Sequence, residues 1–456
     1  MPGSLIVGGG ISGLSTAYYL RKGGAPATIV ESRPRLGGVI QTDRVEGCTL
    51  EAGPDSFLSA KPAALDLIRE LGLADEVIGS NDHLRVTFVR KSGRLVPLPD
   101  GLMMMVPTRI LPLLATPLLS LGTKVRMGLE LLRAPQPHPG DESVADFVRE
   151  HYGQEAVDYL AEPLLSGIYG GDPTQLSVAA VLPRFVELSR QYGSLTRGVL
   201  AARAKSRSNG QPAPLFRTLK AGLGQLVDAV GAAAQPEVIR ARAEAIERVP
   251  AGFRVRIAGD WLECRALVLA CEAHNAGPLA TALDPRLGEL LAGIPYSSSM
   301  TVAVGFDAAD FPAPPEGFGF LVPRKERRRL VACTWVGTKF SYRVPPDKIV
   351  ARCFLGGMED AGVLAESDDA VAAEVQQELR DIAGVTARPR FIRISRWPRS
   401  MAQYTVGHPD RVAEIEARAA AIPGLYFAGN AYQGIGIPDC IRMGKTAAEK
   451  IHAQTV

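Results

Sequence analysis

The chain of 456 residues is longer than one hydrophobic core usually serves, so two or three domains are expected. Hydrophobic residues make up 46% of it, and 51 basic side chains nearly balance 48 acidic ones, for a net charge of +3. So small a charge argues against a nucleic-acid-binding surface. The six cysteines form no CxxC pair, which is typical of packed, reduced thiols in a cytoplasmic protein and not of a metal site or disulfide framework.

The first predicted element is a strand that leads into a glycine-rich turn. Residues 4–14 read SLIVGGGISGL, which places Gly8, Gly10 and Gly13 in a GxGxxG pattern at the start of a helix. Gly8 permits the tight turn, Gly10 lets the backbone approach a pyrophosphate, and Gly13 lets the helix pack close to the strand. Since the strand begins at about Ser4, no signal peptide is expected.

A second strand, at 28–31, ends in Glu31, whose carboxylate can accept hydrogen bonds from both hydroxyls of an adenosine ribose. The strand, the glycine-rich turn, the helix, the second strand and its final acidic residue follow one another at the spacing of a Rossmann-type dinucleotide site. The sequence therefore predicts such a site. The next residues, SRPRLGG, place Arg35, Gly37 and Gly38 in the following loop. This Arg-x-Gly-Gly element resembles flavin enzymes of the glutathione-reductase and amine-oxidase type, so the resemblance is to FAD binders and not to NAD enzymes.

The segment 101–122, GLMMMVPTRILPLLATPLLSLG, is almost long enough to cross a bilayer. Pro107, Pro112 and Pro117 would each remove a backbone donor, and Arg109 sits near the middle, so a membrane span is not expected. Short helices, apolar on several faces, are predicted instead. They could line an apolar pocket, rest on a membrane surface or pack as core.

Further along the chain, Asp141 or Ser143 can cap a helix over 144–152. Strand patterns occur at 253–257, 266–273, 300–306 and 348–357. The basic run RKERRR at 324–329 is interpreted as a solvated turn. The polar stretches 134–141 and 204–214 are predicted loops.

Near the carboxyl end, GLYFAGNAYQGIGIPDCIRMG (424–444) predicts a strand, a glycine-rich loop and a helix that begins near Pro438. The segment resembles the one with which amine-oxidase-type flavoproteins close their FAD site. Asn430 stands where many relatives have Asp, so an amide takes the place of the carboxylate at the expected ribitol or phosphate contact.

Together with these ends, four segments carry a resemblance to the protoporphyrinogen oxidase family, which includes coproporphyrinogen-oxidising enzymes of Gram-positive type. They are EAGPDSFL (51–58), EPLLSGIYGGDPTQLS (162–177), RWPRSMAQYTVGH (396–408) and AGNAYQGIGIPDC (428–440). The match runs essentially the whole length. The glycine motifs and the resemblance together predict FAD contacts from Gly8, Gly9, Gly10, Ile11, Ser12, Gly13, Glu31, Ser32, Arg35, Gly37, Gly38, Gly53, Pro54, Asp55, Ser56, Ala243, Trp397, Gly429, Asn430, Ile435, Gly436 and Ile437.

The resemblance implies non-covalent FAD and a six-electron oxidation of a porphyrinogen to the porphyrin in heme biosynthesis, with O₂ reduced to H₂O₂. Coproporphyrinogen III is favoured, with protoporphyrinogen IX a close second. Lys61, Arg109 and Lys124 are candidate partners for substrate propionates, since Met103 stands where protoporphyrinogen-directed relatives often have an anchoring arginine. Neither a catalytic side chain nor a metal site is nominated, because the cofactor carries the chemistry.

The expected fold class is α/β and α+β, with three domains. A discontinuous FAD-binding domain is placed at 1–80, 215–282 and 388–456. A mixed-sheet substrate domain is placed at 81–98, 191–214 and 283–387, and a helical domain that resembles the family's membrane-binding domain at 99–190. A cytoplasmic location is expected, with peripheral contact at the inner membrane face, a ferrochelatase partner and a monomer or homodimer left open.

Two rival functions remain. An amine oxidase or carotenoid desaturase would share the fold, and in amine oxidases with covalent FAD a cysteine near the carboxyl-terminal flavin segment forms the link; Cys440 lies in that segment, but in a different local pattern. A non-catalytic carrier, as the Rab GDP-dissociation inhibitors are, would lack a complete flavin site.

Overall fold

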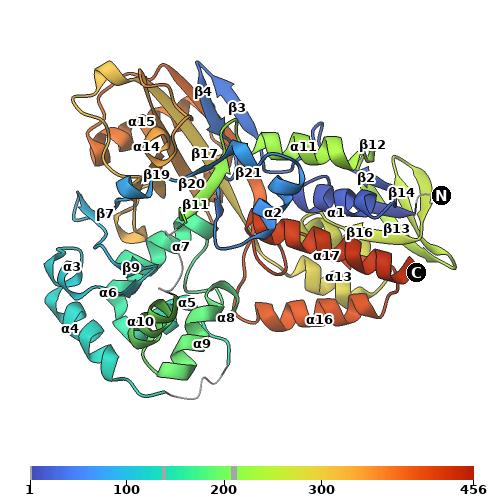
Figure 1. Ribbon diagram of the computed structural model, residues 1–456, viewed down its shortest axis with the longest axis horizontal. Coiled ribbons are helices and arrows are strands. Elements are labelled where there is room, and N and C mark those ends of the chain that lie inside the picture. Colours follow the sequence, from blue (N-terminus) through green and yellow to red (C-terminus); the bar gives the residue numbers. More distant parts are fainter. Residues whose placement is uncertain (1–2, 136–139, 207–212, 456) are drawn as a thin grey trace. The chain divides into compact units, whose positions relative to one another are not determined.

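The computed structural model describes residues 3–135, 140–206 and 213–455, which group into two compact units (Figure 1). The first comprises Met1–Ser80, Pro214–Pro295 and Pro409–Val456, and the second comprises Asn81–Ala213 and Tyr296–His408. Of the predicted loops at 134–141 and 204–214, residues 136–139 and 207–212 lie outside the described residues.

The first unit is built on a five-stranded parallel sheet in the order β12-β2-β1-β16-β22. Its strands are β1 (Ser4–Val7), β2 (Ala27–Val30), β12 (Glu237–Ile239), β16 (Ala266–Leu269) and β22 (Leu425–Phe427). All residues of β1, β2 and β16 are buried, as expected of parallel strands covered on both faces. The predicted Rossmann-type arrangement is therefore confirmed.

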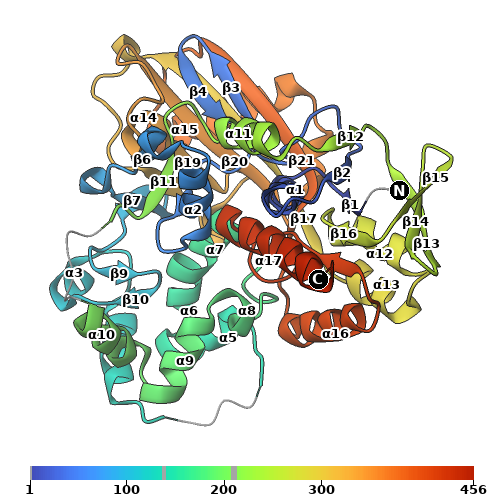
Figure 2. The same ribbon diagram turned by 45° about the vertical axis from the view of Figure 1, so that its right-hand side comes forward.

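Two helices from opposite ends of the chain lie side by side against this sheet, α1 (Ile11–Lys22) and α17 (Ile437–Thr455) (Figures 1 and 2). A side chain at Gly444 of α17 would come within 2.5 Å of the Ser12 carbonyl oxygen, so this contact needs a glycine. The helix α11 (Gly224–Ala234) also packs on α1.

The rest of the first unit consists of smaller sheets and surface helices. The antiparallel sheet of β13 (Ala243–Val249), β14 (Gly252–Ile257) and β15 (Asp260–Cys264) follows β12. The other elements are β3 (Thr42–Val45), β4 (Cys48–Glu51), β5 (Phe57–Leu58), α2 (Ala63–Glu70), η1 (Ala74–Glu76), β6 (Val77–Gly79), β11 (Phe216–Leu219), α12 (Ala273–Ala280), α13 (Pro285–Ala292) and α16 (His408–Ala420).

The second unit contains a mixed seven-stranded sheet in the order β21-β17-β20-β19-β18-β7-β8, in which only the β18–β7 pair is parallel. Its strands are β7 (Thr87–Lys91), β8 (Arg94–Pro97), β17 (Tyr296–Asp307), β18 (Gly319–Leu321), β19 (Ala332–Trp335), β20 (Lys348–Gly357) and β21 (Phe391–Ala402). The helix α15 (Asp368–Ala383) contributes Val371, Val375 and Leu379 to the same core as Val302 and Val304 of β17. The three functional domains and their boundaries stay a prediction.

The helical part of the second unit has its own core, which includes Phe147, Tyr152 and Leu160. Its helices are α3 (Ile110–Ala115), α4 (Leu121–Leu129), η3 (Glu130–Leu132), α5 (Val144–Tyr152), α6 (Gln154–Ala156), η4 (Val157–Ala161), α7 (Glu162–Tyr169), α8 (Val178–Val181), α9 (Pro183–Tyr192) and α10 (Leu195–Ser206). Short one-turn elements complete the unit: η2 (Asp82–Leu84), η5 (Ala308–Asp310), η6 (Arg324–Glu326), α14 (Val336–Lys339) and η7 (Ala361–Ala365).

The structure settles which residue caps α5. Ser143 Oγ accepts a hydrogen bond from the Asp146 amide at 3.0 Å, so Ser143 is the cap. Asp141 instead accepts hydrogen bonds from Ser177 Oγ at 2.7 Å and from the Gly407 amide at 2.8 Å.

The apolar segment at 101–122 differs in part from its prediction as short helices. Residues 102–107 form a hairpin of β9 (Leu102–Met103) and β10 (Val106–Pro107), and only α3 and the start of α4 are helical. Met104 adopts a φ of 56° at the turn, which a run of three methionines does not signal. No helix in the described ranges combines the length and hydropathy needed to cross a membrane.

The basic run at 324–329 lies in a turn, and carboxylates of the same unit surround it. Arg327 Nη2 pairs with Glu162 Oε1 at 2.8 Å, Lys325 Nζ with Asp158 Oδ2 at 3.1 Å, and Arg329 Nη1 with Glu366 Oε1 at 2.5 Å. These ion pairs balance the positive charge within the fold.

Candidate functional site

The glycine turn after β1 contains glycines that serve two different purposes. Gly8 has a φ of 110°, and a Cβ there would lie 2.7 Å from the Ala270 carbonyl. At Gly13 a Cβ would lie 2.0 Å from the Gly8 carbonyl oxygen. Neither position can take a side chain, because the surrounding backbone is already in contact.

Gly10 is different, because a Cβ built there would meet nothing closer than Gly38 Cα at 4.0 Å. Gly10 is also the N-cap of α1 and provides no side chain to cap the first amides of that helix. Bare backbone and a helix N-terminus together suit a phosphate group. A dinucleotide pyrophosphate therefore fits this turn.

Glu31, directly after β2, is buried and held in a fixed orientation. Its Oε2 accepts a hydrogen bond from the Gly9 amide and its Oε1 from the Arg33 amide, both at 2.7 Å. Each carboxylate oxygen keeps a second lone pair, so Glu31 can still accept bonds from ribose hydroxyls.

The loop after Glu31 is shaped by Arg35. The guanidinium donates to the carbonyl oxygens of Leu36 at 3.2 Å, Ile40 at 2.9 Å and Gly38 at 2.6 Å. Burial lowers the pKa of Arg35, and the nearby Arg33 lowers it further. Arg35 thus holds Gly37 and Gly38 beside Gly10, and its own contact with FAD, like that of the exposed Ser32, stays a prediction.

The turn at 53–56 packs on this loop. A Cβ at Gly53 would lie 1.8 Å from the Val39 carbonyl oxygen, so the two backbones touch. Within the turn, which also contains Pro54, Ser56 Oγ donates to Asp55 Oδ1 at 2.6 Å. The second predicted FAD segment therefore lies next to the first.

The carboxyl-terminal segment reaches the same sheet through β22, which pairs with β16. Gly429 follows it with a φ of 145°, and no heavy atom of the described residues lies within 4 Å of the position a Cβ would take. Asn430 follows, and the loop with Ile435 and Gly436 leads to Ile437 at the start of α17. The two ends of the chain thus form one glycine-lined region within the first unit.

Two further predicted FAD contacts lie outside this region. Ala243 is buried at the start of β13, where the pairing with β14 shifts register before Ala245. Trp397 is buried in β21 of the second unit, opposite Ser299 of β17.

Each of the three candidate propionate partners has an oxygen partner in the fold. Lys61 Nζ pairs with Asp439 Oδ2 at 2.6 Å, and Lys124 Nζ donates to the Leu114 carbonyl oxygen at 2.8 Å. Arg109 pairs with Asp100. Lys61 belongs to the first unit and the other two to the second.

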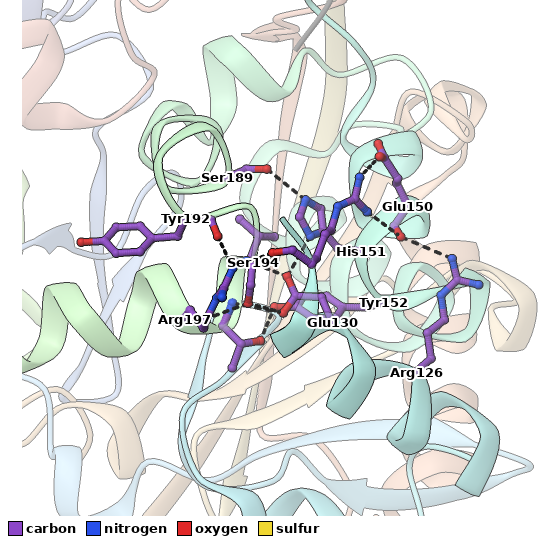
Figure 3. A network of polar contacts seen from close by, with 12 residues as sticks. Arg126, Glu130, Glu150, His151, Tyr152, Ser189, Tyr192, Ser194 and Arg197 are labelled. Carbon is purple, nitrogen blue, oxygen red and sulfur yellow. Dashed lines mark hydrogen bonds and ion pairs between the residues drawn. The ribbon is translucent and has the colours of Figure 1, made fainter. Parts of the chain in front are cut away.

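A buried Ser–His–Glu arrangement lies in the helical part of the second unit (Figure 3). His151 Nδ1 lies 2.9 Å from Glu130 Oε1, and its Nε2 lies 3.2 Å from Ser189 Oγ. Sequence inspection missed it, because the three residues come from η3, α5 and α9 and share no motif.

This cluster has the geometry of a hydrolytic triad, but its contacts serve to hold the surrounding helices together. The side chains of Glu130, His151 and Ser189 are called the structural lock below. The side chains of His151 and Glu130 are each 1% exposed. Glu130 also accepts from Ser194 Oγ at 2.8 Å and from the Leu195 amide at 2.6 Å, which caps the N-terminus of α10. The side chains join three helices and η3, and no substrate can reach Ser189 without unpacking them.

Burial lowers the pKa of His151, which keeps its imidazole neutral. Burial alone would raise the pKa of Glu130, but the hydrogen bonds donated by His151, Ser194 and Thr196 outweigh it and the pKa is lowered. Among the described residues, no three His, Cys, Asp or Glu side chains cluster in a way that could hold a metal ion.

Comparison with known proteins shows the family to which the chain belongs. The family model described as flavin containing amine oxidoreductase matches residues 11–452. A Bacillus subtilis (strain 168) protein named coproporphyrinogen III oxidase is 32% identical, with 97% of this chain and 96% of the relative covered. The Staphylococcus aureus protein of the same name is 31% identical, with 98% of both covered.

A crystal structure from Exiguobacterium sp. 255-15, provisionally named protoporphyrinogen oxidase, is 32% identical and superimposes with a TM-score of 0.89 over 99% of both chains. These matches confirm the amine-oxidase-like fold and the flavin cofactor expected from the sequence. The chain belongs to the flavin-containing amine oxidoreductase family, in the same group as the bacterial coproporphyrinogen III oxidases, and it is an oxidoreductase with FAD as its cofactor.

Proposed function

We propose that this protein oxidises coproporphyrinogen III to coproporphyrin III, with O₂ as the electron acceptor and H₂O₂ as the second product. The observation that carries the proposal is where the two segments most specific to porphyrinogen oxidases lie. Gln403 Nε2 donates to the Tyr169 carbonyl oxygen at 2.8 Å, and the Ser177 amide donates to the Tyr404 carbonyl oxygen at 2.7 Å. SGIYGGD and QYTVGH are therefore neighbours in the second unit, although more than 200 residues separate them in the chain.

Bound FAD supplies the two-electron chemistry, in which a methylene bridge of the macrocycle gives up a hydride and a pyrrole N–H gives up a proton. The chain's part is to bind and orient. Gly10 and the N-terminus of α1 would hold the pyrophosphate, and Glu31 would hold the ribose. The segment 435–437 would lie along the flavin ring, and a contact of Trp397 with the ring stays an expectation from the resemblance.

Proton removal needs no side-chain base in this proposal, because aromatisation of the macrocycle provides the driving force. The two histidines that are buried among the described residues, His151 and His408, agree with that view. His151 lies within the structural lock, and His408 stacks on Tyr404 with ring centroids 4.0 Å apart. Water can take the proton from the macrocycle.

FAD is held non-covalently in this proposal. Cys440, the one cysteine near the carboxyl-terminal flavin segment, is buried and hydrogen-bonded to Ser12, and burial raises the pKa of its thiol to about 11. A thiol in that state is a poor nucleophile toward the flavin. Acid-denatured protein should therefore release all of its yellow colour into the supernatant.

The relatives' names and the charges on the chain support the proposed substrate preference. Both curated relatives reported above are named for coproporphyrinogen III, which carries four propionates where protoporphyrinogen IX carries two. Arg109 and Lys124 are the propionate partners we favour. Their present partners, Asp100 and a backbone carbonyl, lie at exposed or half-exposed positions where exchange for a substrate carboxylate costs little.

The experiment compares turnover of coproporphyrinogen III, protoporphyrinogen IX, putrescine and phytoene, with porphyrin fluorescence and H₂O₂ followed together. We expect three H₂O₂ per coproporphyrin, at least a tenfold higher kcat/KM for coproporphyrinogen III than for protoporphyrinogen IX, and no turnover of the amine or phytoene. Turnover of putrescine or phytoene without either porphyrinogen would assign the protein to one of the rival functions.

We also propose that α3, α4 and η3 contact the surface of a membrane. Leu111 of α3 is 79% exposed and Leu121 of α4 74% exposed, Leu129 and Leu132 further along the chain are exposed as well, and α4 also carries the cationic Lys124. Exposed leucines next to a cation suit the interface of an anionic bilayer.

Sedimentation with vesicles of anionic phospholipid tests this contact. The wild type should co-sediment and the Leu111→Glu/Leu121→Glu variant should not, while Leu84→Glu, at an exposed leucine outside these elements, should behave as the wild type. Equal sedimentation of all three proteins would exclude the contact.

A further inference from the structure

A buried carboxylate lies behind the glycine loop that leads into α17. Asp439, in the first turn of that helix, is 7% exposed. Its Oδ2 accepts from Lys61 Nζ at 2.6 Å and from the Gly436 amide at 3.3 Å. One carboxylate oxygen is thus bound both by an ammonium group and by the loop.

The loop is wrapped closely over this carboxylate. Gly434 has a φ of 115°, and a Cβ there would lie 2.4 Å from Asp439 Cγ. The Asp439 side chain therefore fills the space that a side chain at Gly434 would need. A change of charge or hydrogen bonding at Asp439 therefore changes the position of residues 434–437.

Lys61 connects Asp439 to the predicted FAD segment at 53–56. It follows β5, five residues beyond the turn at 53–56, and the ion pair joins positions 378 residues apart in the chain. On its other side α17 is fixed to the first turn of α1, through the contact of Gly444 with the Ser12 carbonyl and the hydrogen bond of Cys440 to Ser12. Asp439 is thus held between the two segments assigned to the flavin.

The charges at this point bear on the redox state of the cofactor. A negative side chain at a helix N-terminus is favourable in itself, and here Lys61 also neutralises it. The Asp439 side chain is 10% exposed and that of Lys61 46%, and removal of either partner leaves the charge of the other uncompensated. Reduced flavin carries more negative charge than oxidised flavin, so an unpaired Asp439 disfavours reduction and an unpaired Lys61 favours it.

We propose that the Asp439–Lys61 ion pair, which has no net charge, positions the loop 434–437 and sets the reduction potential of the bound FAD. Both are positioning residues, and Lys61 acts on the cofactor and not on a substrate propionate. The proposal requires the family's FAD but not the proposed substrate. Its test is therefore independent of the proposal that the protein oxidises a porphyrinogen.

The test measures the two-electron midpoint potential of the FAD-loaded protein by equilibration with a reference dye. Lys61→Met should lower the potential and Asp439→Asn should raise it, each by about tenfold in the reduction equilibrium constant, or about 30 mV. The double variant should return close to the wild type. Lys61→Arg, which keeps the charge, should leave the potential unchanged.

Lys22→Met is the matched control, since Lys22 Nζ pairs with Glu70 Oε2 at 2.9 Å within the same unit but at the C-terminal end of α1. It should not shift the potential. If Asp439→Asn fails to fold, the contrast between Lys61→Met and Lys61→Arg carries the test alone. A raised KM for coproporphyrinogen III in Lys61→Met with an unchanged potential would overturn the proposal, as would shifts of one sign in both single variants.

Discussion

At the scale of single residues, the site depends on glycines that look alike in the sequence but are required for different reasons. Gly13 is needed because the Gly8 carbonyl occupies its side-chain space, whereas Gly10 has that space open. Gly10 also has a φ of −68°, which any residue can adopt. A glycine at position 10 is therefore not needed by the protein's own fold, which agrees with the proposal that Gly10 leaves room for a phosphate.

Substitution at these two positions should separate cofactor binding from folding. Gly10→Ala should leave the urea midpoint of the FAD-free protein unchanged or slightly raised, because the Cβ fits, but should weaken FAD binding at least tenfold. Gly13→Ala should cost about 1–3 kcal/mol of stability through the clash. Quenching of flavin fluorescence gives the affinity. Wild-type affinity in Gly10→Ala would show that no phosphate approaches this backbone.

The GxGxxG pattern predicts the turn and its partner Glu31 from sequence, because the residues are close together and each has a local reason. The Asp439–Lys61 pair could not be predicted in this way. Each residue alone is an ordinary charge, and only the packing of α17 brings them together.

At the scale of elements, the helical part of the second unit is joined by the Glu130–His151–Ser189 lock. The Ser143 cap of α5 was within reach of sequence reasoning, because capping depends on neighbouring residues. Neither the structural lock nor the hairpin at 102–107 could be predicted from the sequence. The first needs three separate helical elements in register, and the second turns at Met104, where a glycine or asparagine would normally signal the turn.

The lock should make the protein sensitive to acid. The pKa of His151 in the fold lies below its unfolded value of about 6.5, so the unfolded chain takes up the proton first as the pH falls. The stabilisation is complete above about pH 6.5 and declines as the pH drops through the folded pKa. Urea midpoints at pH 7.5, 6.5 and 5.5 would show the decline.

His151→Asn keeps a donor for Glu130 but does not titrate. It should lose about 1–3 kcal/mol at pH 7.5, since Ser189 loses its acceptor, and its stability should fall less between pH 6.5 and 5.5 than that of the wild type. His83→Asn, at an exposed histidine, should follow the wild type. Parallel declines in His151→Asn and wild type would place the acid sensitivity elsewhere.

At the scale of the whole molecule, the chain returns to the sheet of its first strand from distant places, as β12, β16 and β22. β1 lies between β2 and β16, and β22 joins the sheet from the carboxyl end. Periodicity identifies such strands, but parallel order depends on contacts hundreds of residues apart. It was expected here only because both ends resemble flavin-binding segments.

The central claim is that this glycine-lined region holds an FAD that takes electrons from a porphyrinogen. The most direct measurement is anaerobic mixing of the FAD-loaded protein with coproporphyrinogen III in a stopped-flow spectrophotometer. The account predicts that the flavin absorbance bleaches within the turnover time and returns when O₂ is admitted, with porphyrin fluorescence appearing over repeated cycles. An absorbance that stays oxidised with both coproporphyrinogen III and protoporphyrinogen IX, in protein that is reduced by dithionite, would contradict it.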